Sequence, residues 1–331
     1  MLYLGGHTTD QPEGSSGLAR VSYDLVRGFG DAEPLAGPPD PSWLVRGEGE
    51  DPVLYAVSEG GGGAVARVRP GQGVVASAAS GGEGPCHVAV GPDGRWLVVS
   101  NYVGGSIGLV AADGDLLELV DSLEFEGDGP HERQDAPHAH QAVFLDARRL
   151  LVCDLGTDRV HEVSIEDGTL RHTGDAVLLS GTGPRHLALA PGRDDLAWVV
   201  GELDQLVHVL RHDGSGWQVV QSVTTDPDGP EPGETTAGVV VSPDGAHLYV
   251  STRGADTVSV YAVADDGTLT MRQQVVTAHW PRFVGWVPGH EGHRLLVAAE
   301  REGSVDVLAV DEGQLEQTGH SLAWAAPTCV V

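Results

Sequence analysis

The sequence predicts an all-β fold, a seven-bladed β-propeller with four antiparallel strands in each blade. The main observation is a pattern that returns seven times at a period of about 48 residues. Its fullest copy, residues 85–110, contains an apolar strand, a Pro-Asp-Gly turn, a second apolar strand, a Gly-rich loop and a third strand. No segment between the copies has helical periodicity, which argues against helix-pair solenoids and βαβ units.

Each copy supplies the strands of one blade in order, from the centre of the ring outward. The innermost strands are expected to begin near Trp43, His87, His140, His186, Gly238, Phe283 and Cys329. Each second strand ends in a polar residue, and a third strand follows it. The fourth, outermost strand follows an Asp-Gly or Glu-Gly turn at residues 113–114, 167–168, 213–214, 266–267 and 312–313.

The two ends of the chain are expected to complete one blade together. Residues 327–331 provide only an innermost strand, while 2–7 and 17–21 have the pattern of a second and a third strand. Pairing between the ends closes the ring and leaves no free sheet edge at the seam. Because the repeats form one continuous array, residues 1–331 are expected to form a single domain.

Composition limits the cellular location and the cofactors. The sequence has no run of about 18 apolar residues and no signal-peptide pattern at its start, so we expect a cytoplasmic protein with no membrane partner. Cys86, Cys153 and Cys329 lack metal-ligand spacing and fall in predicted strands, where cysteine acts as a small apolar residue. No phosphate-binding glycine loop precedes a helix, and we expect no cofactor.

The net charge of −29 arises from 48 acidic residues against 19 basic ones, and all 19 are arginine. Such a charge repels nucleic acids and anionic membranes, so neither is expected as a partner. We interpret the acidic residues as a strongly solvated surface. An arginine that recurs near the centre of the ring would stand out against this background.

Propeller topology places the start of each innermost strand and the end of each second strand on the same face. The strand starts contribute His87, His140, Arg185, His186 and Arg282, and the strand ends contribute His7, Glu59, Asn101, Asp154, Glu202, Arg253 and Glu300. Two long loops, residues 127–140 and 224–238, should open onto this face. One face therefore gathers histidines, arginines and carboxylates around the central channel.

Several of these segments resemble the lactonase family of seven-bladed propellers. They are Pro137-His138-Ala139-His140, Asp154-Leu155-Gly156-Thr157-Asp158-Arg159-Val160, Gly183-Pro184-Arg185-His186, Ser251-Thr252-Arg253-Gly254, Pro281-Arg282 and Pro327-Thr328-Cys329-Val330. The family includes propeller-type 6-phosphogluconolactonases and is similar to 3-carboxy-cis,cis-muconate lactonizing enzymes. The resemblance implies a site lined by His138, His140, Arg185, Glu202, Arg253 and Arg282. The chain departs from the family pattern at Gly201, Gly238, Thr252 and Glu300.

Lactone hydrolysis needs a base that activates water, donors for the carbonyl oxyanion and a grip on an anionic substrate. We assign His138 or His140, with Glu202, to acid/base chemistry, and expect one histidine to hydrogen-bond Glu202 directly or through one water. Arg185 joins them as a catalytic residue, because guanidinium groups bind oxyanions in pairs. The residues expected to bind substrate are Arg253, Arg282, His87, His186, Asn101, Asp154 and His7. The alternative is that some of these groups only hold blades together.

Three functions remain open at this stage. The first is a lactone hydrolase with a small anionic sugar-acid lactone as substrate, which the resemblance narrows to 6-phosphogluconolactone of the pentose phosphate pathway. The second is a muconate-lactonizing cycloisomerase that uses the same residues. The third is a non-catalytic propeller that binds a peptide or a small acid. No metal is expected, because Arg253 interrupts the ring of strand-end carboxylates. We expect a monomer or weak homodimer.

Overall fold

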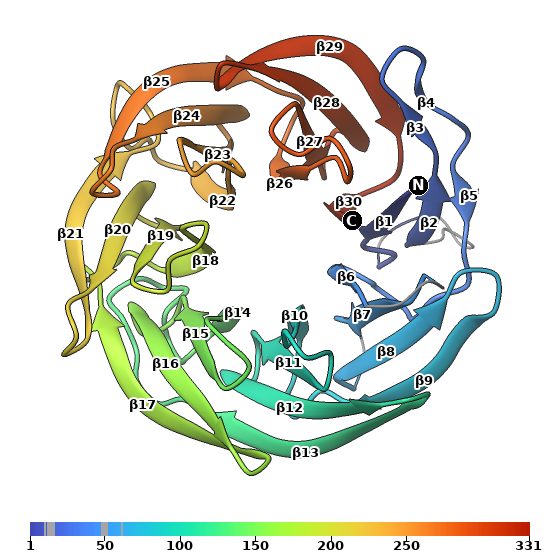
Figure 1. The fold of residues 1–331 in the computed structure, drawn as a ribbon, viewed down its shortest axis with the longest axis vertical. Helices are drawn as coiled ribbons and strands as arrows, with labels where there is room; N and C mark the ends of the chain where they lie inside the picture. Colours follow the sequence, from blue (N-terminus) through green and yellow to red (C-terminus); the bar gives the residue numbers. More distant parts are fainter. Residues whose placement is uncertain (10, 12–16, 48–51, 61) are drawn as a thin grey trace.

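Seven four-stranded antiparallel sheets surround a central channel in the computed structural model, which describes residues 1–9, 11, 17–47, 52–60 and 62–331 (Figure 1). No helix occurs among these residues. The innermost strands are β30 (Pro327–Val330), β6 (Leu44–Arg46), β10 (Pro85–Val90), β14 (Ala139–Phe144), β18 (Pro184–Leu189), β22 (Thr235–Val241) and β26 (Pro281–Trp286). The second strands are β1 (Leu2–Gly6), β7 (Leu54–Ser58), β11 (Trp96–Asn101), β15 (Arg149–Asp154), β19 (Leu196–Gly201), β23 (His247–Arg253) and β27 (Arg294–Ala299).

The two outer strands of each blade follow in chain order. The third strands are β2 (Leu18–Val21), β8 (Ala64–Arg69), β12 (Ser106–Asp113), β16 (Arg159–Glu166), β20 (Leu206–His212), β24 (Thr257–Val263) and β28 (Ser304–Asp311). The outermost strands are β5 (Glu33–Pro34), β9 (Gly73–Ala79), β13 (Leu116–Glu124), β17 (Thr169–Val177), β21 (Trp217–Thr224), β25 (Leu269–Val276) and β29 (Gln314–Ala323). The predicted fold class is therefore confirmed.

The first blade closes the ring as expected. Strand β1 pairs on one side with β30 and on the other with β2, so residues from both ends of the chain share one sheet. All four residues of β30 are buried. A small hairpin, β3 (Tyr23–Asp24) with β4 (Gly28–Phe29), interrupts this blade before the two-residue β5 and is not predicted by the repeat pattern. Its short strands carry too little alternation to be recognised.

The burial pattern of the strands follows their distance from the channel. Every residue of β11 and β19 is buried, because sheets of neighbouring blades cover both faces of a second strand. Residues of β13 alternate between exposed and half-buried, as expected for an outer strand with one solvated face. Each wholly buried valine or leucine contributes roughly 1.5–3 kcal/mol to stability.

Large buried side chains also link adjacent blades through hydrogen bonds. The indole Nε1 of Trp198 donates to the carbonyl oxygen of Gly267 at 2.9 Å, in the outer turn of the next blade. The hydroxyl of Tyr249 donates to the carbonyl of Gly313 at 3.0 Å in the same way. These buried polar atoms are satisfied across the blade interface, so each bond ties the packing of one blade to the turn of the next.

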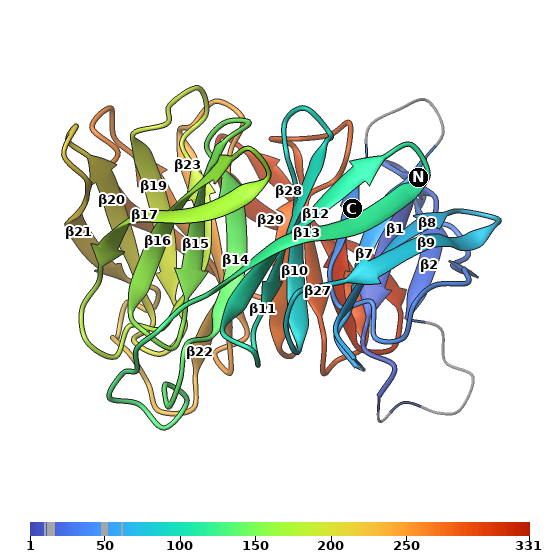
Figure 2. The same cartoon turned by 90° about the horizontal axis from the view of Figure 1, so that it is seen from below.

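The two ends of the ring differ in their loops. The segments that connect β13 to β14 and β21 to β22 extend beyond the same end of the molecule (Figure 2). The tight Pro-Asp-Gly turns lie at the opposite end, where Gly94 and Gly245 adopt φ values of 68° and 74°. These left-handed conformations explain why glycine follows aspartate in the repeat.

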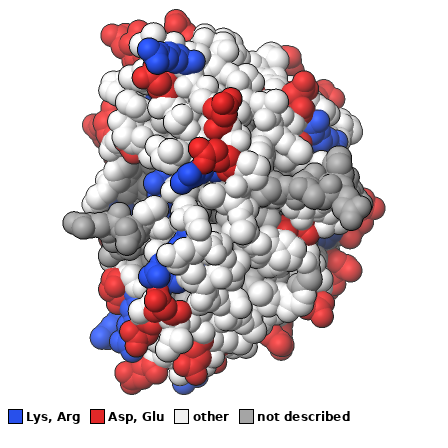
Figure 3. All heavy atoms as spheres, turned by 90° about the vertical axis from the view of Figure 1, so that its right-hand side faces the viewer, with Lys and Arg blue, Asp and Glu red and all other residues white. Residues whose placement is uncertain are grey.

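Acidic side chains are scattered over the outside of the ring rather than gathered in one patch, as Figure 3 shows for the edge that carries the N-terminal blade. Among the described residues, no helix is long and apolar enough to cross a bilayer.

Candidate active site

Four innermost strands carry a β-bulge at the residue that points into the channel. In β10, β14, β18 and β26 the pairing register with the second strand skips one residue, which is Cys86, His140, Arg185 and Arg282 respectively. A bulged residue has no partner opposite it, and the local twist re-aims its side chain. All four side chains line one cavity of about 320 Å³.

This inner cavity continues into a wider mouth on the long-loop face. Its wall consists of Glu59, Cys86, Tyr102, Arg133, His140, Arg185, Glu202, Arg253 and Arg282. The mouth, about 720 Å³, shares Arg133, Glu202, Arg253 and Arg282 with the inner cavity and adds residues that include Trp280, Glu300 and Arg301. The Arg301 guanidinium lies 3.3 Å from the centre of the Trp280 ring. Four guanidinium groups therefore line the inner cavity, and a fifth, that of Arg301, lies at its mouth.

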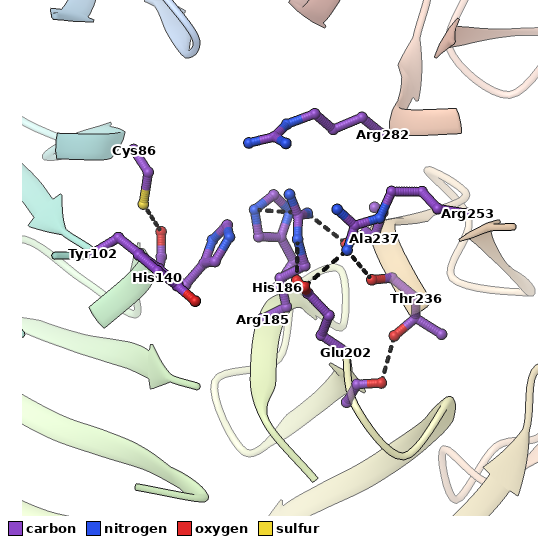
Figure 4. A network of polar contacts seen from close by, with 12 residues as sticks. Cys86, Tyr102, His140, Arg185, His186, Glu202, Thr236, Ala237, Arg253 and Arg282 are labelled. Atoms are coloured by element: carbon purple, nitrogen blue, oxygen red, sulfur yellow. Dashed lines mark hydrogen bonds and ion pairs between the residues drawn. The ribbon is translucent and has the colours of Figure 1, made fainter. Parts of the chain in front are cut away.

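Glu202 holds three of these arginines in place, of which Figure 4 shows Arg185 and Arg253 beside it. Its Oε1 lies 2.6 Å from Nη1 of Arg133 and 3.0 Å from Nη2 of Arg253, while Oε2 lies 2.9 Å from Nε of Arg185. The Glu202 and Arg185 side chains are both 3% exposed. Backbone carbonyls hold the arginines further: Arg185 donates to Ala237 at 2.8 Å and Arg253 to Thr236 at 3.2 Å. The donors are thus fixed before a ligand arrives.

Charge and burial compete at these groups. Burial alone would raise the pKa of Glu202, but the charges of Arg253, Arg185 and Arg133 outweigh burial and hold that pKa well below its usual range. Burial and the neighbouring Arg253 lower the pKa of Arg185 to about 9. Glu202 therefore stays ionised, and its two oxygens act as acceptors for arginine rather than as a proton donor.

Arg282 reaches the cavity from the other side. Its Nη1 lies 3.3 Å from Oε2 of Glu300, whose Oε1 lies 3.7 Å from Nε2 of His7. Although burial lowers the pKa of Arg282, the charges of Glu300, Glu59 and Glu202 raise it overall. The guanidinium of Arg282 points toward the space between Arg253 and His140 (Figure 4).

A cluster of neutral histidines begins at His140 in the cavity wall and continues through His186 and His87. The ring of His140 contacts that of His186 at a centroid distance of 5.1 Å, and Trp43 packs against His186 and His87 at 5.2 and 4.6 Å. Burial, and to a smaller extent the charge of Arg185, lowers the pKa of His87 to about 3. Burial and the same arginine also hold the pKa values of His140 and His186 well below their usual range.

These depressed pKa values predict that the protein loses stability as the pH falls below about 6.5. Between the unfolded and folded pKa values the unfolded chain binds more protons, so each such histidine removes up to about 1.4 kcal/mol per pH unit. Thermal unfolding measured from pH 7 down to pH 4 tests this. His87→Gln should flatten the dependence; an unchanged slope in this variant would show that His87 titrates normally.

The structure places only some of the predicted site residues against the cavity. His140, Arg185, Glu202, Arg253 and Arg282 line it, and His186 and His87 lie beside His140 and Trp43. His7 contacts Glu300 at the mouth. The remaining three, His138, Asp154 and Asn101, are not among the described residues that line either part of the cavity.

Those three residues make structural contacts instead. His138 stacks on the Tyr102 ring at 4.5 Å, and its Nδ1 lies 2.8 Å from the Tyr102 carbonyl oxygen. Asp154 is fully buried and accepts hydrogen bonds from the backbone of His138 and from Nε2 of His161. The Asn101 amide donates to the Ser80 carbonyl at 3.1 Å. A polar residue at a strand end can thus face the blade interior rather than the channel.

The structure shows no direct hydrogen bond between Glu202 and a histidine among the described residues, and a contact through one water stays a prediction. Among the described residues, the charged partners of Glu202 are the three arginines, two on Oε1 and one on Oε2. Sequence reasoning also missed Arg133, whose Nη2 donates to the Tyr102 hydroxyl at 3.1 Å. One signal could have found it, since Arg133 is the sole arginine of the long 127–140 loop.

Comparisons with known proteins agree with this architecture. The model of the seven-bladed β-propeller lactonase family matches residues 1–331. The chain belongs to the lactonase family. It is 31% identical over 258 residues to the 6-phosphogluconolactonase of Bacillus subtilis, an alignment that covers 75% of this chain and 73% of that protein.

Solved structures of similar proteins share the whole ring. A Bacteroides fragilis structure, described as that of a proposed 6-phosphogluconolactonase, has a TM-score of 0.87 and 28% identity, and the match covers 100% of this chain and 96% of that one. The periplasmic gluconolactonase of Pseudomonas aeruginosa has a TM-score of 0.86 at 24% identity, covering 100% and 98%, and this likeness shows the common fold.

The departure from the lactonase pattern at Gly238 has a physical explanation. A Cβ atom at this position would lie 2.9 Å from both the backbone nitrogen and Cγ1 of Val284 in the next blade. The Gly238 amide donates to the Ser251 hydroxyl at 2.9 Å. The innermost strands of the two blades thus approach too closely for a larger side chain, and the arginines of this chain line the cavity without a carboxylate from this strand.

Proposed function

We propose that this chain hydrolyses the lactone of an anionic sugar acid, with 6-phosphogluconolactone as the substrate. The observation that carries the proposal is the convergence of four arginines and one unpaired histidine on a single enclosed cavity. Guanidinium groups bind phosphate and carboxylate in pairs, and they also stabilise a developing oxyanion. The relatives named 6-phosphogluconolactonase support this choice of substrate. Such a reaction belongs to the pentose phosphate pathway, and the cytoplasmic location stays a prediction.

His140 is the base that we propose for the attack of water. Its Nδ1 is buried and has no hydrogen-bond partner among the described residues, and the residue lines the cavity beside Arg185 and Arg282. The positive charges of these arginines lower the pKa of His140 after burial, so an anion bound between them would raise that pKa and strengthen the base. Binding of the anionic substrate would therefore make His140 a stronger base.

The reaction then balances in two steps. Water attacks the lactone carbonyl carbon as His140 takes its proton, and the negative charge that forms on the carbonyl oxygen is stabilised by Arg185 and Arg282. The bond between the carbonyl carbon and the ring oxygen breaks next, and His140 returns the proton to that oxygen. Hydroxy acid is released. Glu202 takes no proton in this scheme and acts as a positioning residue for the arginines.

A comparison of two histidine variants tests this assignment on a panel of lactones. The panel contains 6-phosphogluconolactone, gluconolactone and muconolactone, and acid release is measured at constant pH. On the substrate that is hydrolysed, His140→Asn should lower kcat by about 100-fold or more, the usual effect of losing acid–base assistance. His138→Asn is the matched control, because His138 lies outside the cavity.

Two outcomes would contradict the proposal. A wild-type protein that hydrolyses none of the lactones above the uncatalysed rate would exclude the lactonase function as stated. Equal kcat values for His140→Asn and the wild type would exclude His140 as the base. Isomerisation of muconolactone without acid release would instead favour the cycloisomerase.

A further inference from the structure

A second cluster of chemically active side chains lies away from the candidate active site, at the outer edge of one blade. His161 from β16 meets His172 and Asp175 from β17, with ligand atoms of all three within 4.8 Å of one another. The Nδ1 of His161 and the Nε2 of His172 lie 2.6 and 2.7 Å from the same oxygen, Oδ1 of Asp175. Two imidazoles and one carboxylate therefore converge on one point.

A β-bulge makes this convergence possible. Residues 172 and 175 are separated by an odd number of positions and would face opposite sides of a regular strand. In β17 the register skips Thr173, so that Glu162 pairs with Gly174 and Val163 with His172. The bulge brings both side chains to one side, and His161 stands directly opposite Asp175 in the sheet.

The first histidine is oriented from behind by a buried carboxylate. The Nε2 of His161 lies 3.1 Å from Oδ2 of Asp154, whose side chain is fully buried. The ring of Phe125 stacks on that of His161 at a centroid distance of 3.9 Å and an angle of 8°. Because Asp154 accepts the proton on Nε2, Nδ1 is the nitrogen that faces the cluster, and a metal ion would take the place of its proton. Metal-binding histidines are oriented by carboxylates in this way.

Other blades of the ring show what the fold itself requires at these positions. Four more blades carry the same bulge in the outermost strand, and their equivalents of His161, Asp175 and His172 can be read from the register. They are Ala66, Ser77 and Val74; Gly108, Ser122 and Leu119; His208, Ser222 and Val219; Ser259, Gln274 and Met271. None of the four sets combines two imidazoles with a carboxylate, so folding alone does not explain the cluster.

The blade of His208 is the most informative of these. There the equivalent histidine also has a carboxylate on Nε2, from Asp204 at 2.9 Å, but its Nδ1 bonds the hydroxyl of Ser222 at 2.9 Å. For a histidine with only a packing role, a serine hydroxyl is a sufficient hydrogen-bond partner for Nδ1. In the cluster, that serine is replaced by Asp175, and the neighbouring valine is replaced by His172.

The cluster has room for an ion. It lines a cavity of about 680 Å³ between β13 and β17, which also contains the carboxylates of Glu124 and Glu126. Arg159 approaches only the other oxygen of Asp175, at 3.6 Å. The oxygen that faces the two imidazoles is free of arginine, and one side of the cluster opens to solvent through His172, whose side chain is 41% exposed.

We propose that His161, His172 and Asp175 form a binding site for a divalent transition-metal ion of the zinc type. Two imidazole nitrogens and one carboxylate oxygen supply three ligands, and water or Glu124 completes a four-coordinate shell. A metal-bound oxygen and nitrogen are about 3.3 Å apart at ordinary zinc distances. The two imidazole nitrogens, at 2.6 and 2.7 Å from the Asp175 oxygen, would each need to move away from it by roughly 0.6–0.7 Å. Imidazole with carboxylate suits zinc rather than calcium.

Such an ion would also be connected to the loop of the candidate active site. Asp154, which orients His161 through Oδ2, accepts the backbone amides of His138 and Gly156 through Oδ1 at 2.7 and 2.9 Å. His138 in turn stacks on Tyr102, which bonds Arg133. We assign the ion a structural role at this blade edge, because the cluster lies outside the cavity that holds the arginines.

Zinc binding to the purified full-length chain tests the proposal. Wild-type protein, stripped with a chelator and titrated with Zn²⁺ by calorimetry near neutral pH, should bind one ion at a saturable site. Asp175→Ser and His172→Val each copy the residue of the His208 blade and should fold normally. Each should weaken binding by at least about 100-fold, more than the 10–100-fold that loss of an orienting partner costs.

A matched variant and a second probe distinguish this site from nonspecific zinc binding by surface histidines. His279 contacts Asp256 at 2.7 Å on the surface without a second histidine, so His279→Gln should leave the affinity unchanged. Cobalt(II) bound to wild type should show the intense visible absorption of a tetrahedral centre, and this should disappear in Asp175→Ser. Wild-type affinity equal to that of Asp175→Ser and His172→Val, or a loss in His279→Gln of the same size, would overturn the proposal.

Discussion

Replacing Glu202 with glutamine is expected to damage both activity and stability. The substitution keeps the shape of the side chain but removes the charge that offsets Arg133, Arg185 and Arg253. Breaking a buried ion pair by removing one partner costs about 3–5 kcal/mol, because an uncompensated charge stays inside. The arginines should move apart, and kcat/KM for the lactone should fall by about 100-fold or more, as when a preorganised oxyanion donor is lost.

Glu300→Gln provides the control for this experiment. Like Glu202, Glu300 directly follows the second strand of its blade. Its side chain is 17% exposed, and its contact with Arg282 is longer, at 3.3 Å. Solvent compensates more of the lost charge there, so the stability cost should be clearly smaller. Urea unfolding and steady-state kinetics of both variants measure the two effects. Equal losses in the two variants would contradict a special role for Glu202.

Deleting residues 327–331 is expected to have the largest effect on stability. These residues form the innermost strand of the first blade, and their removal exposes the edge of β1. Cys329 and Val330 belong to two different apolar clusters. The Thr328 hydroxyl also donates to the Ser42 carbonyl at 2.8 Å, and the Tyr3 and Val331 backbones exchange two hydrogen bonds.

Together these contacts contribute roughly 5–10 kcal/mol, at about 1.5–3 kcal/mol for each buried apolar side chain and about 1 kcal/mol for each hydrogen bond. That range is comparable to the total stability of a typical domain. Circular dichroism during thermal unfolding measures the loss. A deletion within the exposed loop between β21 and β22 is the control and should change the unfolding temperature little. A truncated chain that unfolds at the wild-type temperature would contradict this account of ring closure.

The sequence was sufficient to predict the ring because apolar strands and turn residues repeat with a fixed period. It was less informative about the site, where the outcome depends on single-residue register. The repeat alignment treated His140 as the equivalent of His87 and His186. Strand pairing instead makes His140 the equivalent of Cys86 and Arg185, because each of these three innermost strands carries a bulge that the spacing of apolar residues does not reveal.

The direction of strand-end side chains was likewise not predictable from position alone. Asp154 is the last residue of β15, Glu202 directly follows β19 in the neighbouring blade, and both residues carry the same charge. Asp154 turns toward His161 and the backbone of the 127–140 loop, while Glu202 turns toward the channel. Their surroundings decide this, since hydrogen-bond donors from the loop satisfy Asp154, while Glu202 is satisfied by Arg185 of its own blade and by Arg133 and Arg253 from other parts of the ring. Contacts between residues so distant in sequence are set by the assembled ring.

The contrast between the outside of the ring and its channel affects how an anion reaches the site. With a net charge of −29, the molecule repels a negatively charged substrate at a distance, although four arginines attract it inside the cavity. Dissolved salt screens the long-range repulsion over roughly 10 Å at 0.1 M, while contacts inside a narrow cavity are screened much less. Ionic strength should therefore speed the capture of such a substrate, opposite to the behaviour of enzymes whose outer field draws the substrate in.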